Sequence, residues 1–302
     1  MRGTRILVTG GSGFIGSRLV RALLDAGAAV SVADRRPFPD SGVPTVAGDL
    51  ADHEVRAAAV ADGTEVIVHL AAVTSVLKSV EDPVATYRLN VDVTAELLEL
   101  ARHHDVGRFV LASTNAVTGD VGQRSIGENA PLRPLTPYGS TKAAAEMLLS
   151  GYSASYGLKG AALRFANVYG PGMAHKDSFV PRLMRAAADG RGVQIYGDGT
   201  QLRDYVHVDD VVQAILLALR TEHTGPLVIG SGRSESVNDL VVAARRVTGA
   251  PIPVEHVAAK PGEMPAVVLD ISAARALGYE PRHTLASGLA TAWPEFAPAP
   301  VR

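Results

Sequence analysis

The stretch RILVTGGSGFIG at residues 5–16 decides the fold. Its apolar first half predicts a buried strand. The glycines that follow fit two forms of the dinucleotide fingerprint, Gly11-x-Gly13-x-x-Gly16 and Gly10-x-x-Gly13-x-x-Gly16. In either register they allow a tight strand-to-helix turn and a close approach of a pyrophosphate to the backbone. The next helix presents free N–H groups and its positive dipole end to that pyrophosphate. The sequence therefore predicts a dinucleotide site at Gly10, Gly13, Phe14, Ile15 and Gly16.

Length and composition are those of a globular protein with one large or two modest domains. The chain has 302 residues, 47% hydrophobic and 20% charged, with a formal net charge of −2 and no cysteine. This balance supplies no basic stripe for nucleic acid and no disulfide or thiolate zinc site. No apolar run approaches the ~20 residues of a membrane span, and the first strand begins too early for a leader peptide. We therefore expect a cytoplasmic protein without nucleic-acid or membrane partners.

Strand and helix patterns alternate through the first half of the chain. Continuous apolar runs predict buried parallel strands at 5–9, 29–33, 45–47, 66–70, 108–112 and 161–165. Helical patterns fall at 15–24, 83–104 and 138–156. This alternation predicts an α/β fold with a Rossmann-type, doubly wound parallel sheet.

Beyond residue 165 glycine and proline become frequent, and the pattern favours a smaller α+β C-terminal substrate domain. We assign residues 1–165, joined by 203–230, to a dinucleotide-binding Rossmann domain, and residues 166–202 and 231–302 to a domain that binds the substrate. Asp209 and Asp210 precede an apolar run at 211–216, so we expect an aspartate to cap a helix there.

Asp34 closes the second strand, eighteen residues after Gly16. A carboxylate there accepts hydrogen bonds from both ribose hydroxyls and repels a 2′-phosphate, which favours NAD over NADP. Arg35 and Arg36 follow directly and would suit that phosphate, so NADP stays open at this point. Asp49, after the third strand, is either a contact for the adenine amino group or an ordinary turn aspartate.

Tyr138 and Lys142 are four residues apart, and hence on one face of a predicted helix. A phenol with a pKa of ~10 ionises too little to act as a base at neutral pH. A neighbouring ammonium and the positive nicotinamide both favour the phenolate. We therefore interpret the pair as an acid/base centre beside the cofactor, the alternative being an ordinary helix surface.

These motifs resemble those of the extended short-chain dehydrogenases/reductases, in particular the NAD-dependent nucleotide-sugar epimerase/dehydratase family of the UDP-glucose 4-epimerase type. The resemblance covers nearly the whole chain, and its later segments are specific to the sugar-nucleotide branch. It rests on residues 9–16 (TGGSGFIG), 48–50 (GDL), 69–72 (HLAA), 87–91 (YRLNV), 138–142 (YGSTK), 164–172 (RFANVYGPG), 196–205 (YGDGTQLRDY) and 260–263 (KPGE).

The resemblance implies a role for the residues around the reacting sugar. Tyr138 would remove a proton from a sugar hydroxyl while hydride passes to the nicotinamide, and Lys142 would bind the nicotinamide ribose. Thr114, or alternatively Ser113, would hydrogen-bond the reacting oxygen. Further cofactor contacts would come from Asp34, Arg35, Asp49, Leu50, Leu70, Ala71, Ala72 and Asn90.

The resemblance also implies a site for the nucleoside diphosphate. Asn167 and Arg203 would hold the diphosphate, and Lys260 stands where an arginine is usual, which exchanges a guanidinium fork for a point charge. The stretch 193–196 would line the base pocket, through Val193, Ile195 and Tyr196.

One departure from the family pattern bears on the reaction. Dehydratases and decarboxylases of the family carry an acidic residue after the catalytic threonine, whereas this chain has Asn115 and Ala116. Elimination is therefore disfavoured, and a 4-epimerase, which needs only Tyr, Lys and a hydroxyl, is retained. We predict NAD-dependent C4 epimerisation of a nucleoside-diphosphate sugar, a UDP-hexose or UDP-hexuronate, through a transient 4-keto intermediate. The alternatives are an NAD(P)H-dependent 4-ketosugar reductase and a non-catalytic dinucleotide sensor.

Two further features concern assembly and metals. The apolar stripes of 83–104 and 138–156 exceed what sheet packing consumes, and in the resembling family these helices pair across a dimer. We expect a homodimer through them, the alternative being plain core. Asp204, His207 and Asp209 could be drawn as a metal cluster, but strand alternation separates Asp204 from the other two, so we expect no metal.

Overall fold

The centre of the molecule is a seven-stranded parallel sheet, seen in a computed structural model that describes residues 1–259 and 264–297. The strand order β11-β7-β5-β4-β1-β2-β3 is that of a doubly wound sheet, so the predicted fold class is confirmed. The strands are β1 (Arg5–Thr9), β2 (Ala29–Asp34), β3 (Thr45–Ala47), β4 (Val66–His69), β5 (Arg108–Thr114), β7 (Lys159–Phe165) and β11 (Gly225–Ile229). All six predicted strands are present, with ends that differ by up to two residues, and β11 is an addition to them.

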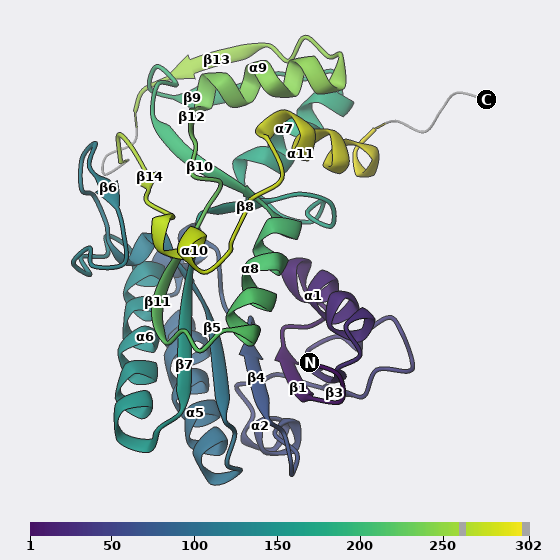
Figure 1. Cartoon of the computed structure of the whole chain (residues 1–302). Helices are drawn as coiled ribbons and strands as arrows, with labels where there is room; N and C mark the ends of the chain where they lie inside the picture. The colour runs from purple at the N-terminus through teal and green to yellow at the C-terminus, as the bar shows by residue number, and fades with distance from the viewer. Residues whose placement is uncertain (260–263, 298–302) are drawn as a thin grey trace.

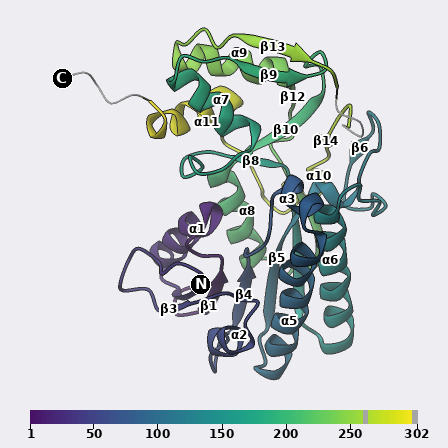
Figure 2. The ribbon, with the colours of Figure 1, turned by 180° about the vertical axis from the view of Figure 1, so that it is seen from behind.

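Helices cover both faces of this sheet (Figures 1 and 2). On one face lie α1 (Phe14–Asp25), α8 (Val208–Arg220) and the short α10 (Ser272–Ala276), which share one apolar core with the sheet. On the other face lie α2 (His53–Ala59), α5 (Val93–His103) and α6 (Pro137–Tyr156), which share a second core. None of the helices within the described ranges is long and apolar enough to cross a membrane.

Two helix predictions differ from the structure in detail. The helical pattern at 83–104 is α4 (Pro83–Tyr87), a π turn η1 (Arg88–Asp92) and α5 in succession, and α3 (Val76–Glu81) precedes them. The predicted aspartate cap of α8 is wrong. Its N-cap is His207, whose side chain accepts the N–H of Asp209, while both aspartates lie in the first helical turn.

The smaller part of the molecule lies above the carboxyl ends of the sheet (Figure 1). Its strands β8 (Asn167–Tyr169), β10 (Leu202–His207) and β12 (Ser234–Ser236) form one sheet, and β9 (Val193–Tyr196) pairs with β13 (Val254–Val257). The helices α7 (Phe179–Ala188), α9 (Val237–Thr248) and α11 (Leu285–Ala292) pack on these strands around a third apolar core. Short elements complete the chain: η2 (Asn115–Val117), β6 (Ser125–Ile126) paired with β14 (Val268–Leu269), and η3 (Trp293–Glu295).

Candidate active site

The glycine turn between β1 and α1 leaves no room for side chains. A Cβ on Gly16 would lie 2.1 Å from the Gly10 carbonyl oxygen, and a Cβ on Gly10, whose φ is +71°, would lie 2.8 Å from the Ala71 nitrogen. Gly13 is the N-cap of α1 and provides no side-chain acceptor for the first N–H groups of the helix. These free N–H groups and the bare turn fit a pyrophosphate. Phe14 is buried in the third core, so only its backbone can serve a cofactor.

The carboxylate of Asp34 is fixed at the same turn. It accepts the backbone N–H of Ser12 at 3.1 Å and that of Arg36 at 3.0 Å. The Arg36 guanidinium donates to the Ser12 carbonyl oxygen at 2.9 Å, so this group is tied back to the turn, whereas Arg35 is exposed. Asp34 thus lies at the end of β2 beside the glycine turn, and its contact with a ribose stays a prediction.

The other residues predicted to contact the adenosine half of the cofactor differ in how exposed they are. Asp49 is exposed, and its carboxylate accepts the N–H of Ala51 at 2.9 Å, as a turn aspartate does. Leu50 is buried in the second core, and the half-buried Ile15 packs against the first and third cores. The side chains of Leu50 and Ile15 serve the fold, and contacts of these residues and of Asp49 with the adenosine stay predictions.

Asn90 organises the loop that follows β4. Its buried side-chain amide accepts the Val73 N–H at 2.8 Å and donates to the Val73 carbonyl at 3.0 Å. The same amide donates to the Thr141 hydroxyl at 3.0 Å. Asn90, in the π turn, therefore connects the loop of Leu70, Ala71 and Ala72 to α6. Its amide group is already hydrogen-bonded to Val73 and Thr141.

Tyr138, Lys142 and Thr114 come together from two elements. Tyr138 is the second residue of α6, and its backbone N–H donates to the Ser79 hydroxyl at 3.1 Å. Thr114, the last residue of β5, hydrogen-bonds the phenol of Tyr138. The buried Lys142 donates from Nζ to the Ala112 carbonyl oxygen at 2.9 Å. The structure thus brings together the acid/base set that the sequence predicts.

The charges of this set are governed by burial. Burial raises the pKa of Tyr138 to about 12, although the Thr114 hydrogen bond works in the opposite direction. Burial also lowers the pKa of Lys142 to about 8, against the charge of Glu146. We expected the Lys142 ammonium to make the phenol more acidic. In the protein alone burial governs the pKa of the phenol, and the Lys142 ammonium donates to a carbonyl of β5.

The choice between Ser113 and Thr114 is decided by the partner of each hydroxyl. The Ser113 hydroxyl donates to the buried carboxylate of Glu146, beneath the sheet edge. Thr114, the last residue of β5, instead interacts with the phenol of Tyr138 at the start of α6. Thr114 is therefore the hydroxyl available to a reacting oxygen.

A cavity of about 390 Å³ lies beside β9 and α7. Val193, Gln194 and Tyr196 line it, as the prediction of a base pocket requires. Ile195 does not line it; this side chain is 2% exposed and packs in the third core, on the strand face opposite to Gln194 and Tyr196. Sequence reasoning missed the α7 side of the cavity, where Phe179 and Arg182 stand one helical turn apart.

The predicted diphosphate ligands lie on β8 and β10 of the three-stranded sheet. Asn167 is exposed and donates to the Asp204 carbonyl at 3.2 Å, and Arg203 is half-buried with one guanidinium bond to the Leu202 carbonyl at 2.7 Å. Lys260 lies outside the described residues.

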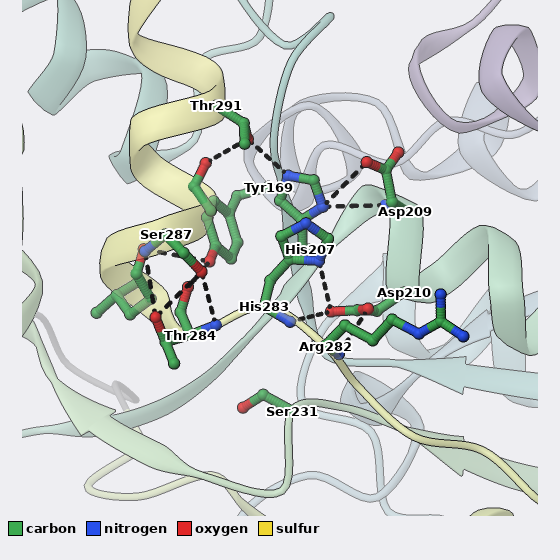
Figure 3. Close-up of polar contacts among 12 residues, drawn as sticks. Tyr169, His207, Asp209, Asp210, Ser231, Arg282, His283, Thr284, Ser287 and Thr291 are labelled. Carbon is green, nitrogen blue, oxygen red and sulfur yellow. Dashed lines mark hydrogen bonds and ion pairs between the residues drawn. The ribbon is translucent and has the colours of Figure 1, made fainter.

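The histidines near α8 do not form a ready metal site (Figure 3). Within the described ranges His207, Asp209 and His283 place ligand atoms within 4.8 Å of one another. The two imidazoles are stacked, with ring centroids 3.8 Å apart and planes at 26°, so their in-plane lone pairs run side by side rather than converge. Asp209 also pairs with Arg18 at 2.6 Å. Asp204 is elsewhere, where its buried carboxylate accepts the N–H groups of Ser231 and Gly232.

A Rossmann sheet with a tyrosine and a lysine at its carboxyl edge is the arrangement of the short-chain dehydrogenases/reductases, and comparisons with known proteins narrow the class. The sequence matches the family model described as NAD dependent epimerase/dehydratase family over residues 6–230. A dTDP-glucose 4,6-dehydratase of Streptomyces griseus is 36% identical, over 96% of this chain and 94% of that protein.

Solved structures are similarly close. MoeE5 in complex with UDP-glucuronic acid and NAD is 39% identical, with a TM-score of 0.89 over 96% of this chain and 99% of that one. The UDP-glucose 4-epimerase of Thermotoga maritima, solved with UDP-glucose, is 32% identical, with a TM-score of 0.90 over 97% and 98% of the two chains.

This chain belongs to the NAD dependent epimerase/dehydratase family, within the extended short-chain dehydrogenases/reductases. The predictions of the family, of an NAD-dependent enzyme of the epimerase type and of NAD as its cofactor are confirmed.

Proposed function

We propose that the enzyme inverts C4 of a UDP-sugar, a UDP-hexose or a UDP-hexuronate, with NAD that is reduced and reoxidised within each turnover. The observation that carries this proposal is the set of Thr114, Tyr138 and Lys142 followed by a turn, Asn115 to Val117, that has no acidic side chain. UDP-glucuronic acid and UDP-glucose are the sugars named for the two similar structures, which supports a UDP-linked substrate.

The residues of the set divide the work of a hydroxyl oxidation. Tyr138 takes the proton of the C4 hydroxyl and later returns it to the C4 oxygen, after the 4-keto sugar has turned its opposite face toward the hydride donor. Thr114 hydrogen-bonds the reacting oxygen, and Lys142 donates to the nicotinamide ribose. NAD, when bound, accepts the C4 hydride and gives it back. Because the pKa of Tyr138 is about 12 in the protein alone, the base form depends on the Lys142 ammonium and on the positive charge of the oxidised ring.

The turn after Thr114 separates epimerisation from elimination. Loss of water from a sugar needs a group that protonates the leaving hydroxyl. At the two positions in question this chain carries the Asn115 amide and the Ala116 methyl group, and neither releases a proton near neutral pH. The similarity to a dehydratase at 36% identity therefore reflects common descent of the fold, and the site chemistry favours the epimerase.

The base pocket suits a pyrimidine with two carbonyl groups. Val193 donates its N–H to the carbonyl oxygen of Pro253, just before β13, and Gly197 donates to that of Val257, at 2.9 Å each. Because a parallel strand bonds through alternate residues, the N–H and C=O of Gln194 face the other edge of β9. Uracil presents an N–H beside a carbonyl oxygen, which complements that pair. Asn167, Arg203 and Lys260 are proposed for the diphosphate, and Phe179 and Arg182 for the walls of the pocket.

We also propose a homodimer through the outer face of α3, α4 and α6. Six apolar side chains on these adjoining helices are between 41% and 63% exposed: Val76, Leu77, Val80, Val84, Tyr87 and Met147. A contiguous apolar face of this kind is unusual on a monomer. The sequence prediction placed the interface at 83–104 and 138–156, and the exposed residues add α3 to it.

The proposal is tested by incubating the NAD-loaded enzyme with UDP-glucose, UDP-glucuronate and dTDP-glucose and following C4 configuration by NMR. We expect equilibration of the C4 epimers of a UDP-sugar without net consumption of NAD. A 4-keto-6-deoxy product would establish a dehydratase. Reduction of a ketosugar at the expense of added NADH or NADPH would establish a reductase, and either result overturns the proposal.

A further inference from the structure

A buried carboxylate lies one helical turn beyond Lys142. Glu146 of α6 is 4% exposed and is paired with Arg164 of β7, which is 3% exposed. Arg164 donates to Glu146 through Nε at 3.1 Å and through Nη2 at 2.8 Å, and its remaining nitrogen donates to the Glu128 carbonyl at 3.0 Å. Burying such a pair costs the hydration free energy of both charges, so the pair adds little to stability and a role in the site becomes the stronger explanation.

The same carboxylate reaches the reacting end of β5. Ser113 donates to Glu146, while Ala112, the residue before it, accepts the hydrogen bond of Lys142 at 2.9 Å. Thr114 is the next residue and touches Tyr138. The end of β5 is therefore held between two charged groups on consecutive turns of α6, and Glu146 is the one that the proposed reaction leaves unused.

Among the charged groups around Lys142, Glu146 is the one that stabilises its ammonium form. Burial lowers the pKa of Lys142 and Glu146 raises it. On β4 the buried His69 has its pKa lowered to about 3 and is neutral. On β7 Arg164 is bonded to Glu146 itself. On α5 the acidic Glu96 and Glu99 lie at the exposed side and pair with Arg56 and Arg102.

We propose that Glu146 is a positioning residue: its carboxylate, fixed by Arg164 and Ser113, holds Lys142 in the ammonium form and fixes the Thr114 end of β5. Lys142 can then donate to a ribose and keep Tyr138 ionised. The consequence for turnover rests on the proposed function, but the charge state of Lys142 does not.

The charge of Lys142 can be measured directly, because the sequence holds five lysines: Lys78, Lys142, Lys159, Lys176 and Lys260. Protein labelled with lysine carrying 13C at Cε gives few signals, and a Lys142→Arg spectrum identifies the one from Lys142. We expect its titration midpoint near pH 8 in the wild-type protein. In Glu146→Gln, which keeps an acceptor for Ser113, the midpoint should fall by about one pH unit or more.

Two further variants separate charge from folding. Glu146→Gln combined with Arg164→Met removes both members of the buried pair, which avoids an unpaired guanidinium, and should show the same lowered midpoint. The matched control is Glu96→Gln, which leaves the buried guanidinium of Arg56 without its carboxylate on the same side of the sheet. This control should lose stability and leave the Lys142 midpoint unchanged.

The outcomes are distinct. An unchanged Lys142 midpoint in a folded Glu146→Gln protein overturns the proposal. Failure of both charge-removed variants to fold assigns Glu146 to folding alone and overturns it as well. If epimerase activity is found, its alkaline limit should move down by the same interval in both variants, a change that a purely structural role would not produce. Absence of that activity with a shifted midpoint contradicts the proposed function and not the role of Glu146.

Discussion

The two ends of the proposed cofactor site are built differently, one from bare backbone and the other from charged side chains. At the pyrophosphate end, Gly10 and Gly16 offer bare backbone, and a single added methyl group would strike a carbonyl oxygen or an amide nitrogen. At the chemical end, Lys142 and Glu146 are charged side chains with less than a twentieth of their surface exposed. Binding at the first end depends on glycines, which have no side chain to block the backbone. Chemistry at the second depends on charges kept from water. Substitutions should therefore act on binding at one end and on ionisation at the other.

The largest effect is expected at the chemical end. Tyr138→Phe removes the only proton-transferring atom of the set while keeping the ring. Turnover should fall by roughly 10³-fold, within the range of general acid/base catalysis, with NAD affinity close to that of the wild type. NMR of the sugar product and calorimetric titration with NAD measure the two quantities. Retained turnover would place the acid/base group elsewhere.

Between the two ends lies His69, and its titration should limit stability in acid. It is buried between the hydroxyls of Thr9 and Thr94, at 2.7 and 3.1 Å. Its pKa is lowered from 6.5 to about 3, mainly by burial. The unfolded chain binds this proton below pH 6.5 and the folded chain does not until about pH 3, so the free energy of unfolding falls as the pH drops through that window.

Urea unfolding at a series of pH values measures this effect. Between pH 6.5 and pH 4 the loss should be roughly 3 kcal/mol for a single group of this kind. His69→Gln cannot titrate and should show a shallower dependence, with the lowered pKa of His207 accounting for part of what is left. An equal slope in the variant would assign the acid sensitivity to other groups.

At the pyrophosphate end, Gly16→Ala places its Cβ 2.1 Å from the Gly10 carbonyl oxygen. The turn must open to accept it, and NAD affinity should weaken by roughly 100-fold, about 3 kcal/mol. Gly151→Ala is the matched control, because a Cβ there meets nothing within 4 Å on the exposed face of α6. That variant should bind NAD normally and gain roughly 1 kcal/mol of helix stability. Normal NAD affinity in Gly16→Ala would contradict the steric account.

The smallest effect is expected for Asp34→Ala, which removes ribose contacts and leaves the bare turn in place. NAD should bind about 10-fold more weakly, the value of one charge-assisted hydrogen bond, and the discrimination against NADP should shrink. Asp62→Ala, whose carboxylate is fully exposed and bonded to His104, is the control. An unaltered NAD affinity would show that Asp34 serves the Ser12 turn alone.

The sequence predicted the central sheet well because its strands are buried on both faces and carry continuous apolar runs. β5 and β7 were each recognised to within two residues for that reason. The short strands of the smaller part escaped prediction, since β8 and β12 span three residues each and obtain their pairing from distant segments. β11 lies within residues 203–230, which the sequence analysis joins to the first domain, but its residues were not predicted as a strand.

Within the site, residue identity was easier to predict than side-chain direction. The acid/base set was found because four-residue spacing puts two side chains on one helix face. Ile195 was assigned to the base pocket although strand alternation buries it, and Ser113 stayed an alternative to Thr114 until the partner of each hydroxyl was known. Glu146 was overlooked, yet its signal was present: it stands four residues after Lys142, as Lys142 stands after Tyr138.

Phe14 connects the two parts of the molecule, because it is the first residue of α1 and packs in the core of the smaller part. The helix that begins with Phe14 is the one whose free N–H groups face the proposed pyrophosphate site. The ring itself lies in the third core, with the Lys176 ammonium 5.4 Å from its centre. The two halves cannot swing apart without drawing the ring into water, at a cost of roughly 2 kcal/mol. The start of the helix proposed to hold the dinucleotide is thus fixed to both parts of the molecule, which suits a redox group that the proposed reaction recycles.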